Sequence, residues 1–240
     1  MASRTMTDVM RDTRIPRRSL LIAMACAAAV AASAPAAWRY LGTRTVPRIA
    51  RIRLQPFGDL PEADVDLIGG MLSGVFAMPV DRMPALALPH DAFYPPRNRY
   101  RADRLLEHLG SRDASAGTLI LGVTGVDISA TKGDVPDWGV LGLALAPGTC
   151  GIVSSFRCRT GARDAAHVRE RCAKVAVHEA GHCMGLHHCP QPRCILRDAE
   201  ARIATIDEAR GLCPACRARL QAWGIRASEG LGLPERRATA

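Results

Sequence analysis

Residues 178–189 read HEAGHCMGLHHC, and their side chains are of the types that bind a metal ion and transfer protons. His178 and His182 are four residues apart, so on a helix they share one face and can bind one metal. Glu179 would lie about 100° around that helix, beside the metal rather than on it. The spacing therefore predicts a zinc ion with a bound water and Glu179 as general base, chemistry suited to hydrolysing a carbonyl group.

The third histidine ligand has two adjacent candidates, His187 and His188. Gly185 accepts a positive φ angle, so the helix can end there and the chain can turn back towards the metal. Counting three residues from Gly185 selects His188, and His187 is expected beside the site or on the surface. The resulting pattern resembles the extended zinc motif of the metzincins.

Four cysteines follow in two short-spaced pairs, Cys189 with Cys194 and Cys213 with Cys216. Two such pairs favour a tetrahedral structural zinc, which gives two Zn²⁺ ions per chain. In an oxidising compartment the alternative is two disulfides, Cys189–Cys194 and Cys213–Cys216. The Cys213–Cys216 spacing would also suit a redox dithiol.

The chain as a whole resembles the archaemetzincin family over roughly residues 48–220. The stretches that carry the resemblance are HEAGHCMGLHHC, CIL (194–196), CPAC (213–216), ILGVTGVDIS (120–129), GIVSSFR (151–157) and RNRY (97–100). It implies a compact metzincin-like α/β fold and a zinc-dependent peptidase, since members of the family act as peptidases and some as aminopeptidases. It also implies a catalytic zinc on His178, His182 and His188 with Glu179 as base, and a second zinc on the four cysteines.

Position 196 departs from the family pattern, which has Met two residues after the second Cys, where this chain has Leu196. In metzincins that Met forms an apolar floor beneath the zinc, and Leu, of similar volume, is expected to preserve it. By the same analogy, residues 139–146 would form the strand at the edge of the cleft that pairs with an extended peptide.

Periodicity predicts an α/β domain over residues 46–223, with a mixed, mainly parallel twisted sheet. We expect a helix from Pro61 with Asp59 as its cap, an irregular edge strand within 75–89, a loop at 90–100 and a central strand at 118–128 buried on both faces. The remaining expected elements are strands at 48–57, 139–146 and 152–156, and helices at 102–109 and 165–184. The cysteine segment, residues 189–220, would be a small zinc-stabilised appendage, and residues 224–240 a polar tail.

Residues 1–37 have the layout of a secretory signal peptide, with Arg17-Arg18 before an uncharged run and Ala34-Pro35-Ala36 as a cleavage site. The arginine pair resembles a twin-arginine signal, which exports folded proteins. The protein is thus expected to be periplasmic or extracellular, or held at a membrane if the run is an uncleaved anchor. If the segment is not a functional signal, the protein is cytoplasmic.

The net charge is +9, and 32 residues are Lys or Arg, of which only Lys132 and Lys174 are lysines. The arginines are spread along the chain without a block, so a coding bias explains them better than nucleic-acid binding. We expect a monomer acting on a peptide or protein. Alternatives are a catalytically impaired peptide-binding module and, less favoured, a nucleic-acid-binding zinc protein. Cys150 and Cys158 could pair if the protein is exported, or be free thiols.

Overall fold

Strand β5 (Thr118–Thr124) lies at the centre of the larger of two sheets, and all seven of its residues are buried. Its side chains alternate between two cores: Leu119 and Leu121 face one and Ile120 faces the other. A strand covered on both faces has no polar side, which is why its sequence is a continuous apolar run. The predicted central strand is confirmed, although it ends at Thr124 rather than at residue 128.

The structure is a computed structural model that describes residues 46–232 except 112–115 and 201. The larger sheet has the order β2-β1-β5-β9-β8. Its strands are β1 (Arg51–Phe57), β2 (Val80–Arg82), β5, β8 (Gly142–Ala144) and β9 (Cys150–Ser154). All neighbours pair in parallel except β8, which is antiparallel to β9 and forms one edge of the sheet. The prediction of a mixed, mainly parallel sheet is confirmed.

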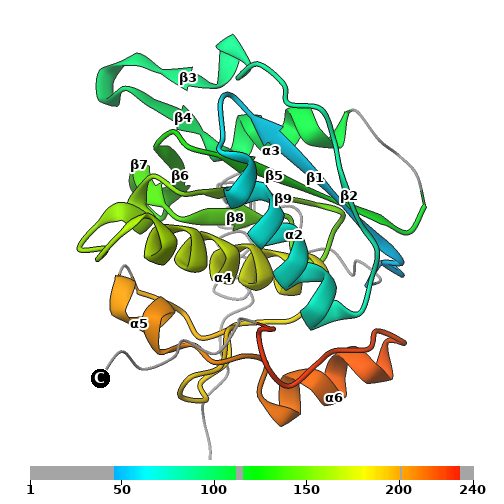
Figure 1. Cartoon of the computed structure of the whole chain (residues 1–240). Coiled ribbons are helices and arrows are strands. Elements are labelled where there is room, and N and C mark those ends of the chain that lie inside the picture. Colours follow the sequence, from blue (N-terminus) through cyan, green and yellow to red (C-terminus); the bar gives the residue numbers. More distant parts are fainter. Residues whose placement is uncertain (1–45, 112–115, 201, 233–240) are drawn as a thin grey trace, which may run out of the picture. The chain divides into compact units, whose positions relative to one another are not determined.

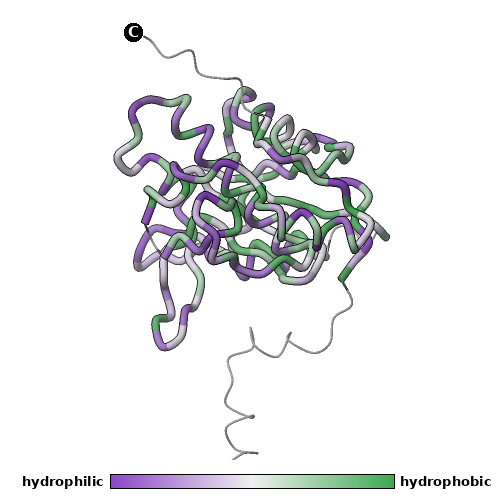
Figure 2. The backbone as a smooth tube through the Cα atoms, turned by 90° about the horizontal axis from the view of Figure 1, so that it is seen from below, coloured by the Kyte–Doolittle hydropathy of each residue, from purple (hydrophilic) through white to green (hydrophobic). Residues whose placement is uncertain are grey.

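Helices cover both faces of this sheet. Helices α2 (Glu62–Phe76) and α4 (Ala165–Cys183) pack side by side on one face (Figure 1). Helix α3 (Ala102–Gly110) packs on the other, where Leu105 and Leu109 meet Phe57 and Ile152. Beyond α4 the chain forms the short helices α5 (Ile203–Glu208) and α6 (Pro214–Ala222). In the described part of the chain, hydrophobic segments gather in the interior and hydrophilic segments in the outer loops (Figure 2).

A second sheet, absent from the prediction, has the order β3-β4-β6-β7. It consists of β3 (Phe93–Tyr94), β4 (Arg99–Arg101), β6 (Ile128–Lys132) and β7 (Val135–Val140), with the one-turn helices η2 (His90–Ala92) and η3 (Pro95–Arg97). The expected loop at 90–100 is therefore wrong in part, and the expected strand at 139–146 divides at Leu141 between β7 and β8. Strands of two or three residues are too short to show an alternating pattern.

Two smaller predictions also need correction. Helix α2 begins at Glu62, and its N-cap Pro61 makes no side-chain cap hydrogen bond, so Asp59 does not cap it. The chain after residue 223 is not simply a polar tail, because Ile225 and Leu231 are buried in the core. Both belong to the larger core cluster, and backbone hydrogen bonds join this segment to α6 (Ile225 N to Leu220 O) and to α2 (Ser228 N to Val75 O).

The predicted signal or anchor segment, residues 1–37, lies outside the described residues. Within the described part of the chain, no helix combines the length and the apolar character needed to cross a bilayer.

Candidate active site

Helix α4 places His178 and His182 on one face, and the turn after it brings in His188. Asp164 caps the helix by accepting from His167 N at 2.7 Å, and the helix ends at Cys183, one residue before the predicted end at 184. Gly185 has φ +93°, and a Cβ there would lie 2.9 Å from Val46 Cγ2, so both conformation and packing require glycine. One ligand nitrogen from each of the three histidines lies within 4.8 Å of the others; His187 is not part of this group, as predicted.

Backbone carbonyls fix the orientation of two of the three rings. His178 Nδ1 lies 2.8 Å from Ile195 O, and His182 Nδ1 lies 2.7 Å from Leu186 O. A carbonyl can only accept, so each Nδ1 carries the proton and each Nε2 keeps the lone pair that binds a metal. The two Nε2 atoms are 3.0 Å apart. Burial lowers the pKa of His178 to about 4 and that of His182 to about 3, which favours the neutral ligand form.

His188 is oriented by a carboxylate that sequence reasoning missed. Its Nδ1 lies 3.4 Å from Asp198 Oδ2, and both side chains are half exposed. Histidines that bind zinc commonly donate their other ring N–H to a carboxylate or a carbonyl. Asp198 follows His188 by ten residues in a segment without a motif, so no spacing rule could have identified it.

Glu179 lies beside the histidines rather than among them. Its side chain is 8% exposed, and burial raises the pKa of its carboxyl group to about 8. Strand β8 passes close over it at Gly142, where a Cβ would lie only 2.6 Å from Glu179 Cγ. The absence of a side chain at position 142 therefore makes room for this carboxyl group.

Leu196 is fully buried beneath the histidine pair. A Cβ at Gly181, between His178 and His182 on α4, would lie 3.2 Å from Leu196 Cδ2. Leucine thus occupies the apolar floor that the sequence led us to expect at this position.

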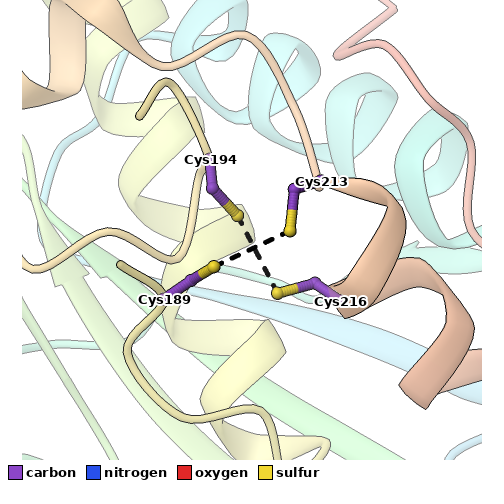
Figure 3. A group of neighbouring side chains, drawn as sticks. All are labelled: Cys189, Cys194, Cys213 and Cys216. Atoms are coloured by element: carbon purple, nitrogen blue, oxygen red, sulfur yellow. Dashed lines mark hydrogen bonds between the residues drawn. The ribbon is translucent and has the colours of Figure 1, made fainter. Parts of the chain in front are cut away.

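The four cysteines converge as two crossed pairs between the segment after α4 and the start of α6 (Figure 3). Cys189 Sγ lies 3.7 Å from Cys213 Sγ, and Cys194 Sγ lies 3.9 Å from Cys216 Sγ. Four sulfurs bound tetrahedrally at ~2.3 Å from zinc would be about 3.8 Å apart. All four are free thiols, so neither alternative disulfide is present and the geometry fits a metal site.

The other described cysteines belong to neither cluster. Cys150, Cys158, Cys172 and Cys183 are buried and form no disulfide, so the possible Cys150–Cys158 pairing is not found. Cys183 Sγ donates to the carbonyl of Cys150 at 3.2 Å, which ties α4 to β9.

A cavity of about 580 Å³ lies beside the histidine site and extends along α4 to Lys174. Its lining includes His178, Glu179 and His188, the β7–β8 segment from Trp138 to Leu143, and residues of the helix η4 (Arg157–Arg159) and of α5. The edge strand β8 borders this cavity, in agreement with the predicted cleft-edge strand. Asp127, for which the sequence suggested no role, binds Arg157 on the cavity wall.

A trio of histidines placed to share one metal ion, with a buried carboxyl group beside it in a cleft at a sheet edge, is the arrangement typical of zinc metallopeptidases. The model of the family described as peptidase family M54 matches residues 78–222. The chain therefore belongs to peptidase family M54 and is a zinc metallopeptidase.

Relatives and solved structures agree with this assignment. The archaemetzincin of Haloquadratum walsbyi is 28% identical over 172 residues, which are 69% of this chain and 96% of that protein. The crystal structure of archaemetzincin from Methanopyrus kandleri is similar with a TM-score of 0.63 at 28% identity, covering 75% of this chain and 98% of that one. The structure of the Archaeoglobus fulgidus protein, complexed with malonate, has a TM-score of 0.60 at 29% identity, covering 70% and 99%.

Proposed function

We propose that His178, His182 and His188 bind the catalytic zinc, and that Cys189, Cys194, Cys213 and Cys216 bind a second, structural zinc. The first assignment is supported by three ligand nitrogens within 4.8 Å of one another, with two rings oriented by carbonyls. The second is supported by sulfur separations of 3.7 and 3.9 Å, which match a tetrahedral thiolate site. The donor sets suit zinc, a borderline ion that accepts imidazole and thiolate.

The proposed reaction is hydrolysis of a peptide bond with Glu179 as general base. Zinc, when bound, polarises the scissile carbonyl and lowers the pKa of a water towards ~7. Glu179 lines the same cavity as His178 and His188, where it can accept the proton of that water and return it to the leaving amine. Strand β8 can pair with an extended substrate through its free edge. The convergence of histidines, carboxyl group and edge strand on one cavity carries this proposal.

Glu179→Gln tests the mechanism, because the amide keeps the shape of the side chain but cannot accept the proton. This variant is expected to retain two zinc ions per chain and the folded structure while losing hydrolysis. Peptide cleavage at the wild-type rate would show that Glu179 is not the base.

Alanine variants of the adjacent residues His187 and His188 test which of the two binds the catalytic zinc. His188→Ala is expected to lose one of the two zinc ions, whereas His187→Ala is expected to retain both. Zinc content per purified chain, measured by elemental analysis, decides the assignment, and equal losses from the two variants would contradict it.

Aminopeptidase action is a finer proposal that rests on the family, some of whose members have this activity. Peptides with a free or an acetylated N-terminus distinguish the two modes, since an aminopeptidase cleaves only the free form. Cleavage within acetylated peptides would instead establish an endopeptidase.

For residues 1–37 we propose a cleaved, twin-arginine-like signal, which would let the thiolate site load zinc before export. Mass spectrometry of the mature protein tests this, with cleavage after Ala36 expected and an intact N-terminus in the membrane fraction supporting an anchor instead. The proposed monomeric state is checked by light scattering on the purified chain.

A further inference from the structure

Arg157 lines the same cavity as His178 and Glu179, but the reaction proposed above does not use it. Its guanidinium group is bound side-on by Asp127, with Nε 2.8 Å from Oδ1 and Nη2 3.0 Å from Oδ2. Asp127 is buried and is held from another side by Arg99, whose Nε lies 2.7 Å from Oδ2. The plane of the Arg157 guanidinium is therefore fixed by two hydrogen bonds to a buried carboxylate.

Strand β7 makes room for this side chain at Gly139. A Cβ at position 139 would collide with Nη2, Cζ and Nε of Arg157, so the guanidinium lies directly against the backbone of the strand. Every residue except glycine at this position would displace the cation. The cavity wall is thus shaped around Arg157, on the same β7–β8 segment that makes room for Glu179 at Gly142.

The outer edge of the guanidinium is available to a ligand. A guanidinium has five N–H donors in a plane, and Asp127 takes the edge formed by Nε and Nη2. Among the described residues, none accepts a hydrogen bond from Nη1, and the Arg157 side chain is 31% exposed. The remaining Nη1–Nη2 edge is a fork whose geometry matches both oxygens of a carboxylate.

Of the other cations that line the cavity, Lys132, Lys174 and Arg197, Lys174 is less available than Arg157. It lies one helical turn before His178, its side chain is 2% exposed, and its Nζ is 3.0 Å from Glu170 Oε1. Nζ also donates to Asp207 O at 3.3 Å. Its charge is therefore already balanced inside the protein, whereas Arg157 keeps unused donors.

We propose that Arg157 determines specificity by binding a carboxylate of the substrate near the scissile bond. The carboxylate would belong to an Asp or Glu side chain or to the C-terminus of a peptide. This inference rests on the proposed use of the cavity as the peptide-binding cleft.

Paired fluorogenic peptides test the proposal with the full-length, zinc-loaded protein. One set replaces each position in turn with Glu or with Gln, and a second compares a free C-terminal carboxylate with its amide. Charge-assisted hydrogen bonds of this kind predict a kcat/KM about 10- to 100-fold higher for the carboxylate member of one pair. The set that shows the preference identifies the source of the carboxylate.

Arg99 supplies the matched control, because it also binds Asp127 but does not line the cavity. Arg157→Gln is expected to abolish the preference for the carboxylate, and Arg99→Gln is expected to retain it. Gly139→Ala keeps the charge of Arg157 but displaces its guanidinium, so this variant should also show a reduced preference for the carboxylate. If Arg157→Gln does not fold, Gly139→Ala provides the test of Arg157 instead.

Equal kcat/KM values within every pair for the wild type would overturn the proposal, as would equal loss of preference in the Arg157 and Arg99 variants. If the wild type hydrolyses no peptide, the proposed peptidase reaction is wrong, but the carboxylate-binding role of Arg157 can still be tested by binding. Fluorescence anisotropy with the same labelled peptides then decides the inference: tighter binding of carboxylate members, lost in Arg157→Gln, supports it, and indistinguishable affinities refute it.

Discussion

Gly142 offers the most direct test of how the cleft positions its proposed general base. A Cβ on residue 142 would lie 2.6 Å from Glu179 Cγ, 2.7 Å from Oε1 and 2.9 Å from Cδ, whereas ordinary contact begins at 3.4 Å. In Gly142→Ala the carboxyl group or the strand must therefore retreat by about 0.8 Å. Glu179 is 8% exposed, so it has little free space, and a retreat shifts its carboxyl group from its place beside the histidines.

A displacement of this size is expected to lower kcat/KM about 100-fold, because misplacing a catalytic group by ~1 Å has an effect of that order. The factor corresponds to about 2.7 kcal/mol in the activation barrier. Zinc content should stay at the wild-type level, since the methyl group does not reach a proposed metal ligand. The measurement is steady-state hydrolysis of a fluorogenic peptide together with elemental analysis of the same preparation.

Gly74→Ala is the control, because a Cβ at that position meets nothing within 4 Å. It should leave both kcat/KM and zinc content unchanged. Wild-type activity in Gly142→Ala would refute the reasoning, since the base would then tolerate the shift or would not be Glu179. Loss of activity together with loss of zinc would show that the methyl group acts through the metal site instead.

Three further predictions concern the support of the two metal sites and the stability of the fold. Cys189→Ser should weaken zinc binding at both sites, because Cys189 directly follows the ligand His188; competition with a chelator measures this, and an unchanged catalytic-site affinity would disprove the coupling. Asp198→Asn, which removes the carboxylate 3.4 Å from His188 Nδ1, should weaken the catalytic zinc about 10- to 100-fold in the same competition. Asp207→Ala should destabilise the fold by about 3 kcal/mol in urea unfolding, because Arg171, 3% exposed, loses its carboxylate partner. Bonding to Arg171 lowers the pKa of Asp207 to about 2, so this stabilisation is complete above the unfolded pKa of ~3.9 and is lost as the pH falls towards 2. The stability difference between the variant and the wild type should accordingly close between about pH 4 and pH 2; a difference that persists there would exclude the ion pair as its cause.

The elements predicted correctly are those whose pattern lies within one segment. The apolar run of β5 and the helix of residues 165–183 extend over many residues, so period and length identify them. Strands β3 and β4 of the second sheet were missed because they have two and three residues and are defined by their partners, not by their own composition.

The same division holds for the site. His178, His182 and His188 were found because their positions on one helix and its following turn are encoded in their spacing. Gly142 and Arg157 were not found from the sequence, because the role of each depends on a residue far away in the chain. Gly142 makes room for Glu179, and Arg157 is held by Asp127. A single sequence contains no periodicity that joins such pairs.

The two proposed metal sites are joined by more than the His188–Cys189 peptide bond. Ile195 N donates to Gly211 O at 2.8 Å, and Ile195 O accepts from His178 Nδ1 at 2.8 Å. Ile195 directly follows Cys194, and Gly211 precedes Cys213 by two residues. The backbone carbonyl that orients His178 therefore lies next to Cys194 and is hydrogen-bonded to the segment that leads to Cys213. A metal on the four thiolates would therefore stabilise two parts of the histidine site at once: the position of His188 through Cys189, and the ring of His178 through Ile195. This dual connection gives a physical reason for the structural site to lie directly beside the catalytic one.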